Sequence, residues 1–579
     1  MTAGCDYQRA GRLAEAVDCF TRALITKPDS VDAYVCRSVA LKAQGEVAKA
    51  IDDAVSALDL DDSPVAKFLF VDCIEKLRFT QERLGISRLL ARALTETWCR
   101  PKQLDKAAVS LIKQDTAISA WLQRPADELF GPAGLGAIAG HDLLLAPLTT
   151  TPVCDLELER FLTVARRAML GRVGKVGADE LALRFGGALA RQCFINEYVF
   201  EPNDEEACKV VALKESLQYA LESRSPVDPF NLVVLGSYCS LRALEGAEGL
   251  LAEHWPNAVD KLLTQQIREP AEETRLASGI PQITPIGNRV SKLVREQYEE
   301  NPYPRWVTTV PAKAVESMDI FLERSFPCAS YQPIEKVGRM DILVAGCGTG
   351  QHSIEVGSRF PNASVLAVDL SLTSLAYAKR KTRELGIGNI EYAQADILEL
   401  AALDRQFDLI EACGVLHHLG DPLAGWRVLL TLLRTKGIMA VGLYSERARA
   451  GINVARRFIA EKGYGCSAED IRRCRAEMMV PRGSTLWRFE SSDFFSLSAC
   501  RDLLFHVQEH QFSLPEIKAF LAENRLCFLG FVLSASVKER YRTRFPDDAA
   551  MTDLDHWHAF EIENPYTFDA MYQFYVQRT

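Results

Sequence analysis

The segment that most constrains this chain is the decapeptide from Asp341 to Gly350, which reads D-I-L-V-A-G-C-G-T-G. Its apolar run, Ile342 to Ala345, has the length of a short buried parallel strand. Glycines follow at alternate positions, Gly346, Gly348 and Gly350. A backbone that turns sharply and approaches a ligand needs glycine, because no Cβ then stands in the way. The decapeptide therefore predicts a strand that opens into a nucleotide-binding turn.

A second apolar run, Ser364 to Val368, ends at Asp369, nineteen residues after Gly350. A carboxylate at that separation is expected to accept hydrogen bonds from the two ribose hydroxyls of a bound nucleoside. The glycine spacing is G-x-G-x-G, whereas dinucleotide folds favour G-x-G-x-x-G, in which the third glycine lets the helix start pack close to a pyrophosphate. The G-x-G-x-G spacing therefore argues against a dinucleotide as the cofactor.

With the strand before it and the acid after it, this loop resembles the cofactor loop of class I S-adenosylmethionine-dependent methyltransferases. Those enzymes hold a nucleoside that carries a methionine tail and no phosphate, so the resemblance implies S-adenosyl-L-methionine as the cofactor. It also implies that Asp396, which follows a third expected strand (Ile390 to Ala393), contacts the exocyclic amine of adenine, and that a neighbouring backbone amide reaches the ring. Cofactor contacts are expected from Gly346, Cys347, Gly348, Gly350, Asp369, Leu370, Asp396, Ile397 and Cys413.

The later segments follow the same family in chain order and imply an α/β, doubly wound sheet of seven strands, the last of them antiparallel. The cofactor would lie outside the carboxyl ends of the strands, at the switch point. Ser513 with Glu516 predicts a capping box at the start of a helix. The expected elements are a fourth strand with its loop (Phe407 to Leu419), a helix (Pro422 to Leu433), a fifth strand (Gly437 to Leu443), a helix (Ser513 to Asn524), a sixth strand (Leu526 to Leu533) and the seventh (Tyr572 to Gln577).

The fourth strand lacks two motifs that would define the methyl acceptor. There is no Pro-Cys pair for covalent attack on cytosine, and Glu411-Ala-Cys-Gly414 stands where an Asp/Asn-Pro-Pro-aromatic motif would act on planar nitrogens. These absences favour a hydroxyl, an aliphatic amine, a carboxylate or an activated carbon as the acceptor. Cys347 and Cys413 are expected to fill space rather than to act as nucleophiles. His417 and His418 either line the active site or form a satisfied pair in a loop.

Two segments are candidates for acceptor recognition. The first, Gln297 to Trp306, reads Q-Y-E-E-N-P-Y-P-R-W, and its prolines keep the backbone extended. If it forms a lid over the cofactor, Tyr298 and Arg305 approach the cofactor carboxylate; a linker pinned by aromatic anchors is the alternative.

The second segment, Arg501 to His510, lies where this fold inserts its substrate cap, about residues 446–512. Asp502, His506 and Glu509 are spaced to share one helical face, which would offer a general base; a solvated surface is the alternative. The candidate catalytic residues are the histidines His417, His418, His506 and His510.

An internal repeat occupies the N-terminus. Tyr7, Gly11, Ala16 and Ala23 recur 34 residues later as Leu41, Gly45, Ala50 and Ala57, the period of tetratricopeptide repeats. Small residues at these positions let two antiparallel helices approach closely. The first helix of the first unit is expected to be missing or very short, and a third unit from about Val65 is degenerate. The repeats are expected either to bind a protein partner or to cap the next domain.

The composition sets the outer limits. A length of 579 residues predicts several domains, and a net charge of −10 gives no support for nucleic-acid binding. No apolar run is long enough to span a membrane. Sixteen cysteines without a C-x-x-C pair suggest reduced thiols in the cytoplasm, and no metal site is expected, His556 and His558 being read as structural.

The chain is therefore expected to be multidomain, with an N-terminal all-α part and a C-terminal α/β part. Residues 1–88 form the repeats, residues 89–275 a helical middle domain, and residues 276–579 the methyltransferase domain. The whole resembles bacterial proteins that join tetratricopeptide repeats to a methyltransferase. The expected function is methyl transfer to an unknown acceptor, a protein or a small molecule. A non-catalytic scaffold that keeps the fold is the alternative.

Overall fold

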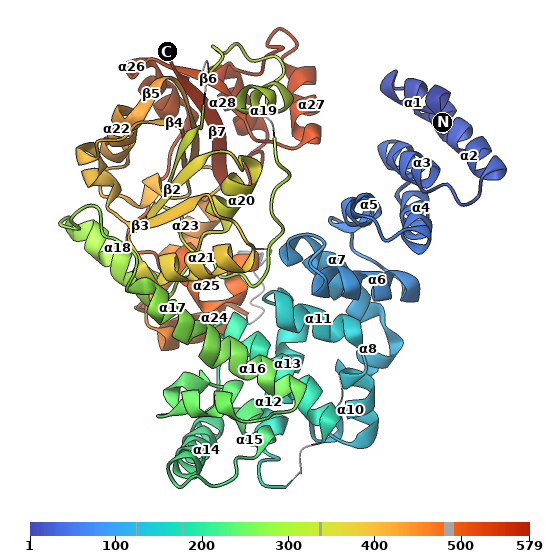
Figure 1. Ribbon diagram of the computed structural model, residues 1–579, viewed down its shortest axis with the longest axis vertical. Coiled ribbons are helices and arrows are strands. Elements are labelled where there is room, and N and C mark those ends of the chain that lie inside the picture. Colours follow the sequence, from blue (N-terminus) through green and yellow to red (C-terminus); the bar gives the residue numbers. More distant parts are fainter. Residues whose placement is uncertain (123, 125, 176–178, 316, 335–337, 480–490) are drawn as a thin grey trace. The chain divides into compact units, whose positions relative to one another are not determined.

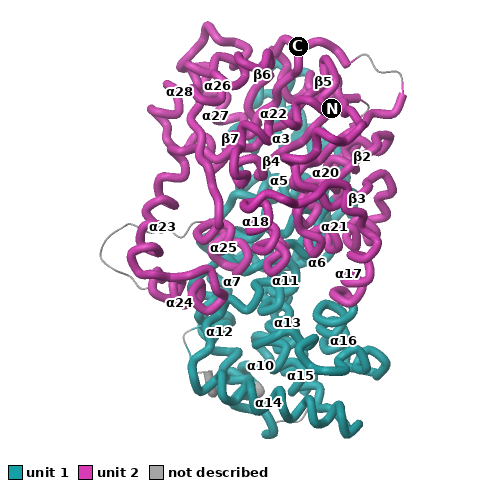
Figure 2. Tube along the Cα trace, turned by 90° about the vertical axis from the view of Figure 1, so that its left-hand side faces the viewer, with its two compact units in different colours: residues 1–268, 306–310 teal, residues 269–305, 311–579 magenta. Residues whose placement is uncertain are grey.

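The computed structural model describes residues 1–122, 124, 126–175, 179–315, 317–334, 338–479 and 491–579 (Figure 1). The chain divides into two compact units, residues 1–268 with 306–310 and residues 269–305 with 311–579 (Figure 2). The predicted division of the N-terminal part at residue 88 stays a prediction. None of the helices in the described ranges combines the length and the apolar content that a membrane crossing needs.

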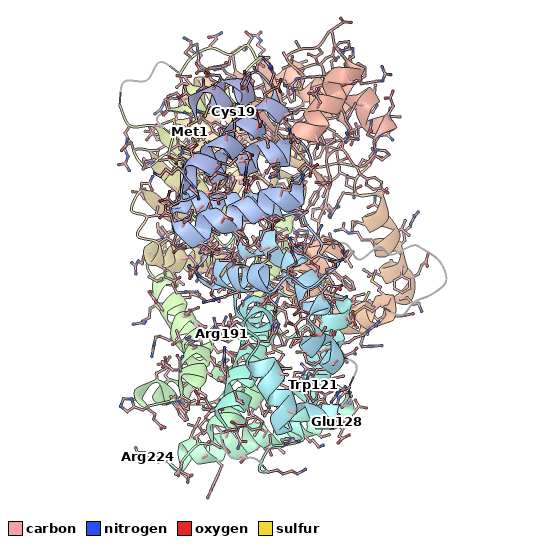
Figure 3. The ribbon with its side chains drawn as sticks, turned by 90° about the vertical axis from the view of Figure 1, so that its right-hand side faces the viewer. Met1, Cys19, Trp121, Glu128, Arg191 and Arg224 are labelled. Atoms are coloured by element: carbon pink, nitrogen blue, oxygen red, sulfur yellow. The ribbon has the colours of Figure 1, made fainter. Side chains whose placement is uncertain are left out.

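The first unit begins with helices that pack on their neighbours in sequence, near Met1 and Cys19 in Figure 3. The first helix is short, and Leu13 and Val47, which begin α2 and α4, are 34 positions apart. Gly11 and Gly45 adopt positive φ (71° and 84°) in the turns between the helices. The helices are α1 (Thr2–Arg9), α2 (Leu13–Thr26), α3 (Val31–Ala43), α4 (Val47–Leu60), α5 (Pro64–Ile74) and α6 (Leu84–Thr95).

Helices make up most of the rest of the first unit, where a helical middle region was expected. Helix α12 runs from Leu156 to Leu170, and Asn203 with Glu206 forms a capping box on α14. The α-helices are α7 (Asp105–Gln114), α8 (Thr116–Leu122), α9 (Ala126–Leu129), α10 (Pro132–Ala139), α11 (Asp142–Thr150), α12 (Leu156–Leu170), α13 (Glu180–Ile195), α14 (Asp204–Glu222), α15 (Pro229–Gly236) and α16 (Asn257–Leu263). Short turns η1 (Pro101–Leu104), η2 (Leu241–Ala243), η3 (Ala247–Ala252) and η4 (Thr264–Arg268) complete the unit.

The second unit is built on a mixed seven-stranded sheet with the order β3-β2-β1-β4-β5-β7-β6. The first five strands are parallel, and β7 pairs antiparallel with both β5 and β6. The seven strands predicted from the sequence are all present, including the antiparallel last one. They are β1 (Asp341–Ala345), β2 (Ser364–Asp369), β3 (Ile390–Gln394), β4 (Phe407–Cys413), β5 (Leu433–Tyr444), β6 (Leu526–Phe531) and β7 (Met571–Arg578).

Side chains alternate between the two faces of the sheet, and helices cover both faces. Leu343 and Ile410 belong to the apolar cluster with α22 (Pro422–Leu432) and α26 (Leu514–Glu523). Ile342 and Leu409 belong to the cluster with α20 (Gln351–Arg359) and α21 (Leu372–Glu384). The expected doubly wound arrangement is present, and the capping box of Ser513 and Glu516 opens α26 as predicted.

The remaining helices of the second unit flank the sheet before, within and after it. Arg380 of α21 is buried and pairs with Glu269 and Glu273, which fastens α17 to α21. The helices are α17 (Glu269–Ala277), α18 (Arg289–Glu300), α19 (Met318–Ser325), α23 (Ala450–Lys462), α24 (Ala468–Met479), α25 (Leu497–Leu504), α27 (Ala535–Arg544) and α28 (Leu554–Glu563), with the turns η5 (Ile397–Ala402), η6 (Leu416–His418) and η7 (Ser492–Phe495). Helices α23, α24 and α25 lie in the predicted cap insertion.

Candidate functional site

The loop between β1 and α20 needs glycine at three positions. Gly346, Gly348 and Gly350 have φ of 72°, 52° and 85°, which L side chains rarely adopt. A Cβ on Gly346 would lie 2.3 Å from Val415, and one on Gly350 would lie 2.4 Å from the Cβ of Ala378. Val415 and Ala378 therefore pack too closely against the loop to leave room for a side chain at Gly346 or Gly350. This packing fixes the path of the loop at the carboxyl end of β1.

Asp369 ends β2 beside this loop. Its Oδ2 accepts a hydrogen bond from the Gly348 amide at 2.8 Å, and its Oδ1 accepts one from the Ser371 amide at 2.9 Å. Burial raises the pKa of this carboxyl, while the backbone amides of Ser371, Gly348 and Leu370 oppose the rise. Because each oxygen retains a further lone pair, the carboxylate is oriented to accept from a nucleoside sugar.

Asp396 follows β3 and is fully buried. Its amide donates to the Thr284 hydroxyl at 2.8 Å, and its Oδ1 accepts from the Leu398 amide at 3.0 Å. In the described part of the chain, no donor reaches its buried Oδ2. An unsatisfied buried carboxylate oxygen is costly, so this atom fits an external donor such as the exocyclic amine of adenine.

The segment before Trp306 covers the glycine loop. A Cβ on Gly348 would lie 2.6 Å from the Tyr303 carbonyl oxygen, and the Thr349 hydroxyl donates to the Pro304 carbonyl oxygen. The Glu299 carboxylate accepts from the Leu372 amide at 2.7 Å, at the start of α21. The sequence pattern did not identify Glu299, because its partners lie more than 70 positions further along the chain.

The other predicted cofactor residues lie along the same edge. Cys347 and Ile397 are buried, and Leu370 and Cys413 are half-buried at the ends of β2 and β4. Arg305 lies close enough to the Tyr377 hydroxyl on α21 to oppose the rise of its pKa, which burial raises.

Tyr298 connects this edge to the cap. Its carbonyl oxygen accepts from the Ser371 hydroxyl at 3.1 Å, next to Asp369. Its hydroxyl donates to Asp502 Oδ1 at 2.6 Å and lies 3.1 Å from His506 Nε2. Tyr298 therefore contacts the turn after Asp369 through its carbonyl oxygen and a buried carboxyl group of the cap through its hydroxyl.

His506 has a defined tautomer in this network. The Gln508 amide donates to its Nδ1 at 3.1 Å, so the proton is on Nε2 and points at the Tyr298 hydroxyl. Burial raises the pKa of Asp502 to about 7, against the Tyr298 hydrogen bond. Burial and the neighbouring His418 lower the pKa of His506. Asp502 is therefore the group of this network that titrates near neutral pH.

His417 and His418 lie in η6, after β4, and both are buried. The His417 ring stacks on Tyr444, with centroids 3.8 Å apart, and the His418 ring stacks on His506 at 3.7 Å. Burial lowers the pKa of His417 well below its usual value and that of His418 to about 4. Both rings are therefore neutral at physiological pH.

The prediction that Asp502, His506 and Glu509 share a helical face is wrong. Helix α25 ends at Leu504, because the chain beyond it pairs with other segments: the His510 amide donates to the His417 carbonyl oxygen, and the Phe512 amide to that of Tyr444. Asp502 and His506 still meet, through Tyr298.

The other two polar residues of that segment have different partners. Glu509 binds Arg449 and Arg456 instead of facing Asp502. The His510 ring contacts the Gln508 side chain at 2.8 Å.

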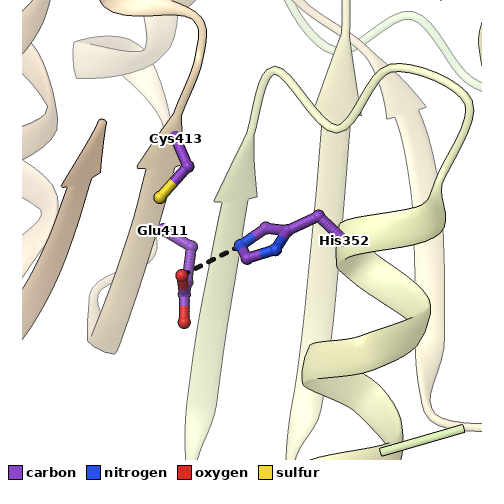
Figure 4. A group of neighbouring side chains, drawn as sticks. All are labelled: His352, Glu411 and Cys413. Carbon is purple, nitrogen blue, oxygen red and sulfur yellow. Dashed lines mark hydrogen bonds and ion pairs between the residues drawn. The ribbon is translucent and has the colours of Figure 1, made fainter. Parts of the chain in front are cut away.

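A further contact was not predicted from the sequence. His352, in the first turn of α20, places Nε2 2.9 Å from Oε2 of Glu411 on β4 (Figure 4). Burial opposes the charge of His352, but Glu411 and the Cys413 thiol raise its pKa well above the usual value. Glu411 and Cys413 are two residues apart on β4 and so face the same side of the sheet. The alternation of side chains along β4 could have predicted that Glu411 and Cys413 lie on one face, but not that His352 joins them.

Residues 342–437 match the family model described as a methyltransferase domain. An uncharacterized protein of Synechococcus is 31% identical over 207 residues, which are 34% of this chain and 49% of that protein. The malonyl-(acyl-carrier protein) O-methyltransferase of Acetivibrio thermocellus is 26% identical over 149 residues, 24% of this chain and 51% of that enzyme. The chain spans about half the length of these curated relatives.

Among solved structures, PKMT2 from Rickettsia typhi in complex with AdoHcy is similar, with 17% identity and a TM-score of 0.32 over 46% of this chain and 54% of that chain. The family match covers the glycine loop, Asp369, Asp396 and β4. Residues 342–437 of this chain are therefore similar to methyltransferase domains.

Proposed function

We propose that this chain is an S-adenosyl-L-methionine-dependent methyltransferase whose active site lies at the carboxyl edge of the sheet in the second unit. The observation that carries the proposal is the unsatisfied Oδ2 of buried Asp396, in the turn whose Ala395 amide donates to the carbonyl oxygen of Asp369. A scaffold that had lost its ligand would have no need of a buried carboxylate oxygen without a donor.

The protein residues supply binding and orientation. Asp369 accepts from the ribose, Asp396 accepts from adenine, and the segment around Tyr303 and Pro304 closes over the glycine loop. When bound, the cofactor supplies an activated methyl group on a sulfonium. Good alignment of the acceptor with that methyl supplies about 7–11 kcal/mol, so the acceptor needs positioning more than activation.

The acceptor side is the Tyr298, Asp502 and His506 network. Asp502 is the group to take a proton from an acceptor that must lose one, because its pKa of about 7 balances protonation state and basicity at neutral pH. His506 and His418 remain neutral and position this carboxyl group through Tyr298 and ring stacking. A hydroxyl or an aliphatic amine therefore fits this site better than a carboxylate, which has no proton to lose at that pH.

Label transfer tests the function. A cell lysate is incubated with the chain and cofactor carrying a labelled methyl group, and with Asp369→Asn as the comparison. Labelled product that depends on wild-type chain and is lost with Asp369→Asn supports the enzyme. Cofactor binding without any labelled product would favour the scaffold. Label in protein bands or in low-mass material separates the two acceptor classes.

We further propose that the N-terminal helices bind a protein partner or substrate. Phe68 and Val65 of α5 are 70% and 59% exposed and lie three positions apart on the helix, so they form one exposed apolar surface that is available to a partner. If the acceptor is a protein, Phe68→Glu should reduce labelling of that protein and leave cofactor affinity unchanged. Equal labelling by Phe68→Glu would remove this surface from the proposal.

A further inference from the structure

A cluster of three potential metal ligands lies between α20 and β4. A ring nitrogen of His352, a carboxylate oxygen of Glu411 and Cys413 Sγ all lie within 4.8 Å of one another. Figure 4 shows the three side chains converging from the start of the helix and from alternate positions of the strand. Neither Asp369 nor Asp396 belongs to this cluster.

The Glu411 carboxylate is not satisfied by the contacts within the cluster. Glu411 is only 1% exposed, and its Oε2 is 2.9 Å from His352 Nε2. Over the residues that the structure describes, no donor reaches its buried Oε1. A structural ion pair would have both oxygens satisfied, because an unpaired buried carboxylate oxygen is costly. The orphan oxygen points to a missing ligand.

A second group of potential metal ligands does not contain a carboxylate oxygen without a donor. His418, Asp502 and His506 also lie within 4.8 Å of one another. The Tyr298 hydroxyl lies within hydrogen-bond distance of Asp502 and His506, and His418 Nδ1 lies 2.8 Å from the Gln508 carbonyl oxygen. These groups already satisfy one another, so that group is a hydrogen-bond network.

We propose that His352, Glu411 and Cys413 bind one divalent cation of the zinc class. Imidazole nitrogen, carboxylate oxygen and thiolate sulfur together favour zinc over the hard cations magnesium and calcium. Ligand atoms on a tetrahedral zinc lie about 3.3–3.7 Å apart, so small side-chain rotations complete the site. On binding, the Cys413 thiol and the protonated His352 ring each give one proton to solvent, so that sulfur coordinates as thiolate and nitrogen as neutral imidazole.

Three protein ligands leave the fourth tetrahedral position open. The His352 side chain is 37% exposed, so solvent reaches this side of the cluster. An open position is the arrangement of a reactive zinc site, whereas structural zinc sites are closed by four protein ligands. The fourth ligand is therefore a water molecule or a small donor molecule from solution.

The test is zinc titration of the full-length, chelator-treated chain against a chromophoric chelator. The wild-type chain is expected to bind one equivalent, and His352→Ala, Glu411→Gln and Cys413→Ser should each weaken binding by at least about 100-fold. Cys527→Ser and His558→Ala are matched controls that should bind as the wild type does. Circular dichroism of the metal-free variants checks folding, and Glu411→Gln keeps the side-chain volume.

Cobalt substitution gives a readout that depends on the ligand set. Cobalt bound by the wild type should show a sulfur-to-metal charge-transfer band that Cys413→Ser lacks and Cys527→Ser retains. No stoichiometric zinc in the wild type would overturn the proposal. Zinc affinity in Glu411→Gln and Cys413→Ser equal to that of the wild type would also overturn it. So would a wild-type cobalt complex without the sulfur-to-metal band.

Discussion

At the scale of single residues, the two strand-end aspartates differ in how much of their hydrogen bonding the protein itself satisfies. Asp369 accepts from backbone amides with both oxygens, so it holds the glycine loop in place, and in the proposed function it also binds the sugar. Asp396 has one oxygen satisfied and one without a donor. A substitution of Asp369 would therefore disturb the glycine loop as well as cofactor binding. A substitution of Asp396 tests cofactor binding with less effect on the loop.

Asp396→Asn should weaken binding of S-adenosylhomocysteine by about 10–100-fold, a loss of roughly 1.5–3 kcal/mol. An asparagine amide cannot accept from both the Leu398 amide and the adenine amine, because one of its two ends is a donor. Isothermal titration calorimetry measures the affinity. Asp404→Asn, an exposed change nearby, is the control, and an affinity equal to that of the control would remove Asp396 from the adenine site.

Asp502 should make stability depend on pH. Its pKa is raised to about 7 from an ordinary value of 3.8, so the folded chain holds a proton that the unfolded chain loses near pH 4. The contribution of the Asp502 carboxyl to the free energy of unfolding is fully present below pH 4 and is lost as the pH rises through 7. The stability of the wild type relative to Asp502→Asn should therefore fall between about pH 4 and pH 7.

Urea denaturation at several pH values measures this difference. Tyr298→Phe removes a hydrogen bond that lowers the Asp502 pKa, so in that background the fall should extend to higher pH. A difference that is constant or that grows with pH would contradict the account of Asp502.

At the scale of elements, the glycine loop is shaped by contacts as much as by backbone angles. Gly348→Ala would place a methyl group 2.6 Å from the Tyr303 carbonyl oxygen and should displace the segment that covers the loop. Gly386→Ala is the matched control, since its φ is 67° and nothing lies within 4 Å of its Cβ. Calorimetry should show weaker cofactor binding only for Gly348→Ala. Equal losses in both variants would mean that backbone strain alone matters.

Most of the strands were predictable because they contain short apolar runs that end at a turn or an acid. The ends of α22 and β5 were not, because β5 begins at Leu433, four residues earlier than its apolar run at Gly437. The helix expected through His506 failed because the chain after Leu504 pairs with η6 and β5. Local periodicity cannot anticipate such tertiary pairing.

Part of the site was predictable for a related reason. Gly346 and Asp369 lie close in sequence and follow adjacent strands, so their spacing carries the information. His352 and Glu411 are 59 positions apart, and they come together because β4 pairs with β1, which precedes α20. The Tyr298 contact with Asp502 spans 204 positions. Neither contact has a spacing that a single sequence could reveal.

At the scale of the whole molecule, every residue assigned to the cofactor belongs to the second unit. Ligand stabilisation acts on the unit that binds, so S-adenosylhomocysteine should raise the unfolding temperature of that unit. Ala50→Leu overpacks the fully buried start of α4 in the first unit and should lower stability there. Differential scanning calorimetry should show the same ligand-induced shift in this variant and in the wild type. Loss of the shift in Ala50→Leu would contradict the assignment of binding to the second unit.

The central claim is that the carboxyl edge of the seven-stranded sheet binds S-adenosyl-L-methionine. The most direct test is isothermal titration calorimetry of the full-length chain with S-adenosyl-L-methionine and with S-adenosylhomocysteine. We predict saturable binding of both at one site per chain, lost together in Asp369→Asn. Titrations of folded wild-type chain that show no heat with either ligand at millimolar concentration would contradict the claim.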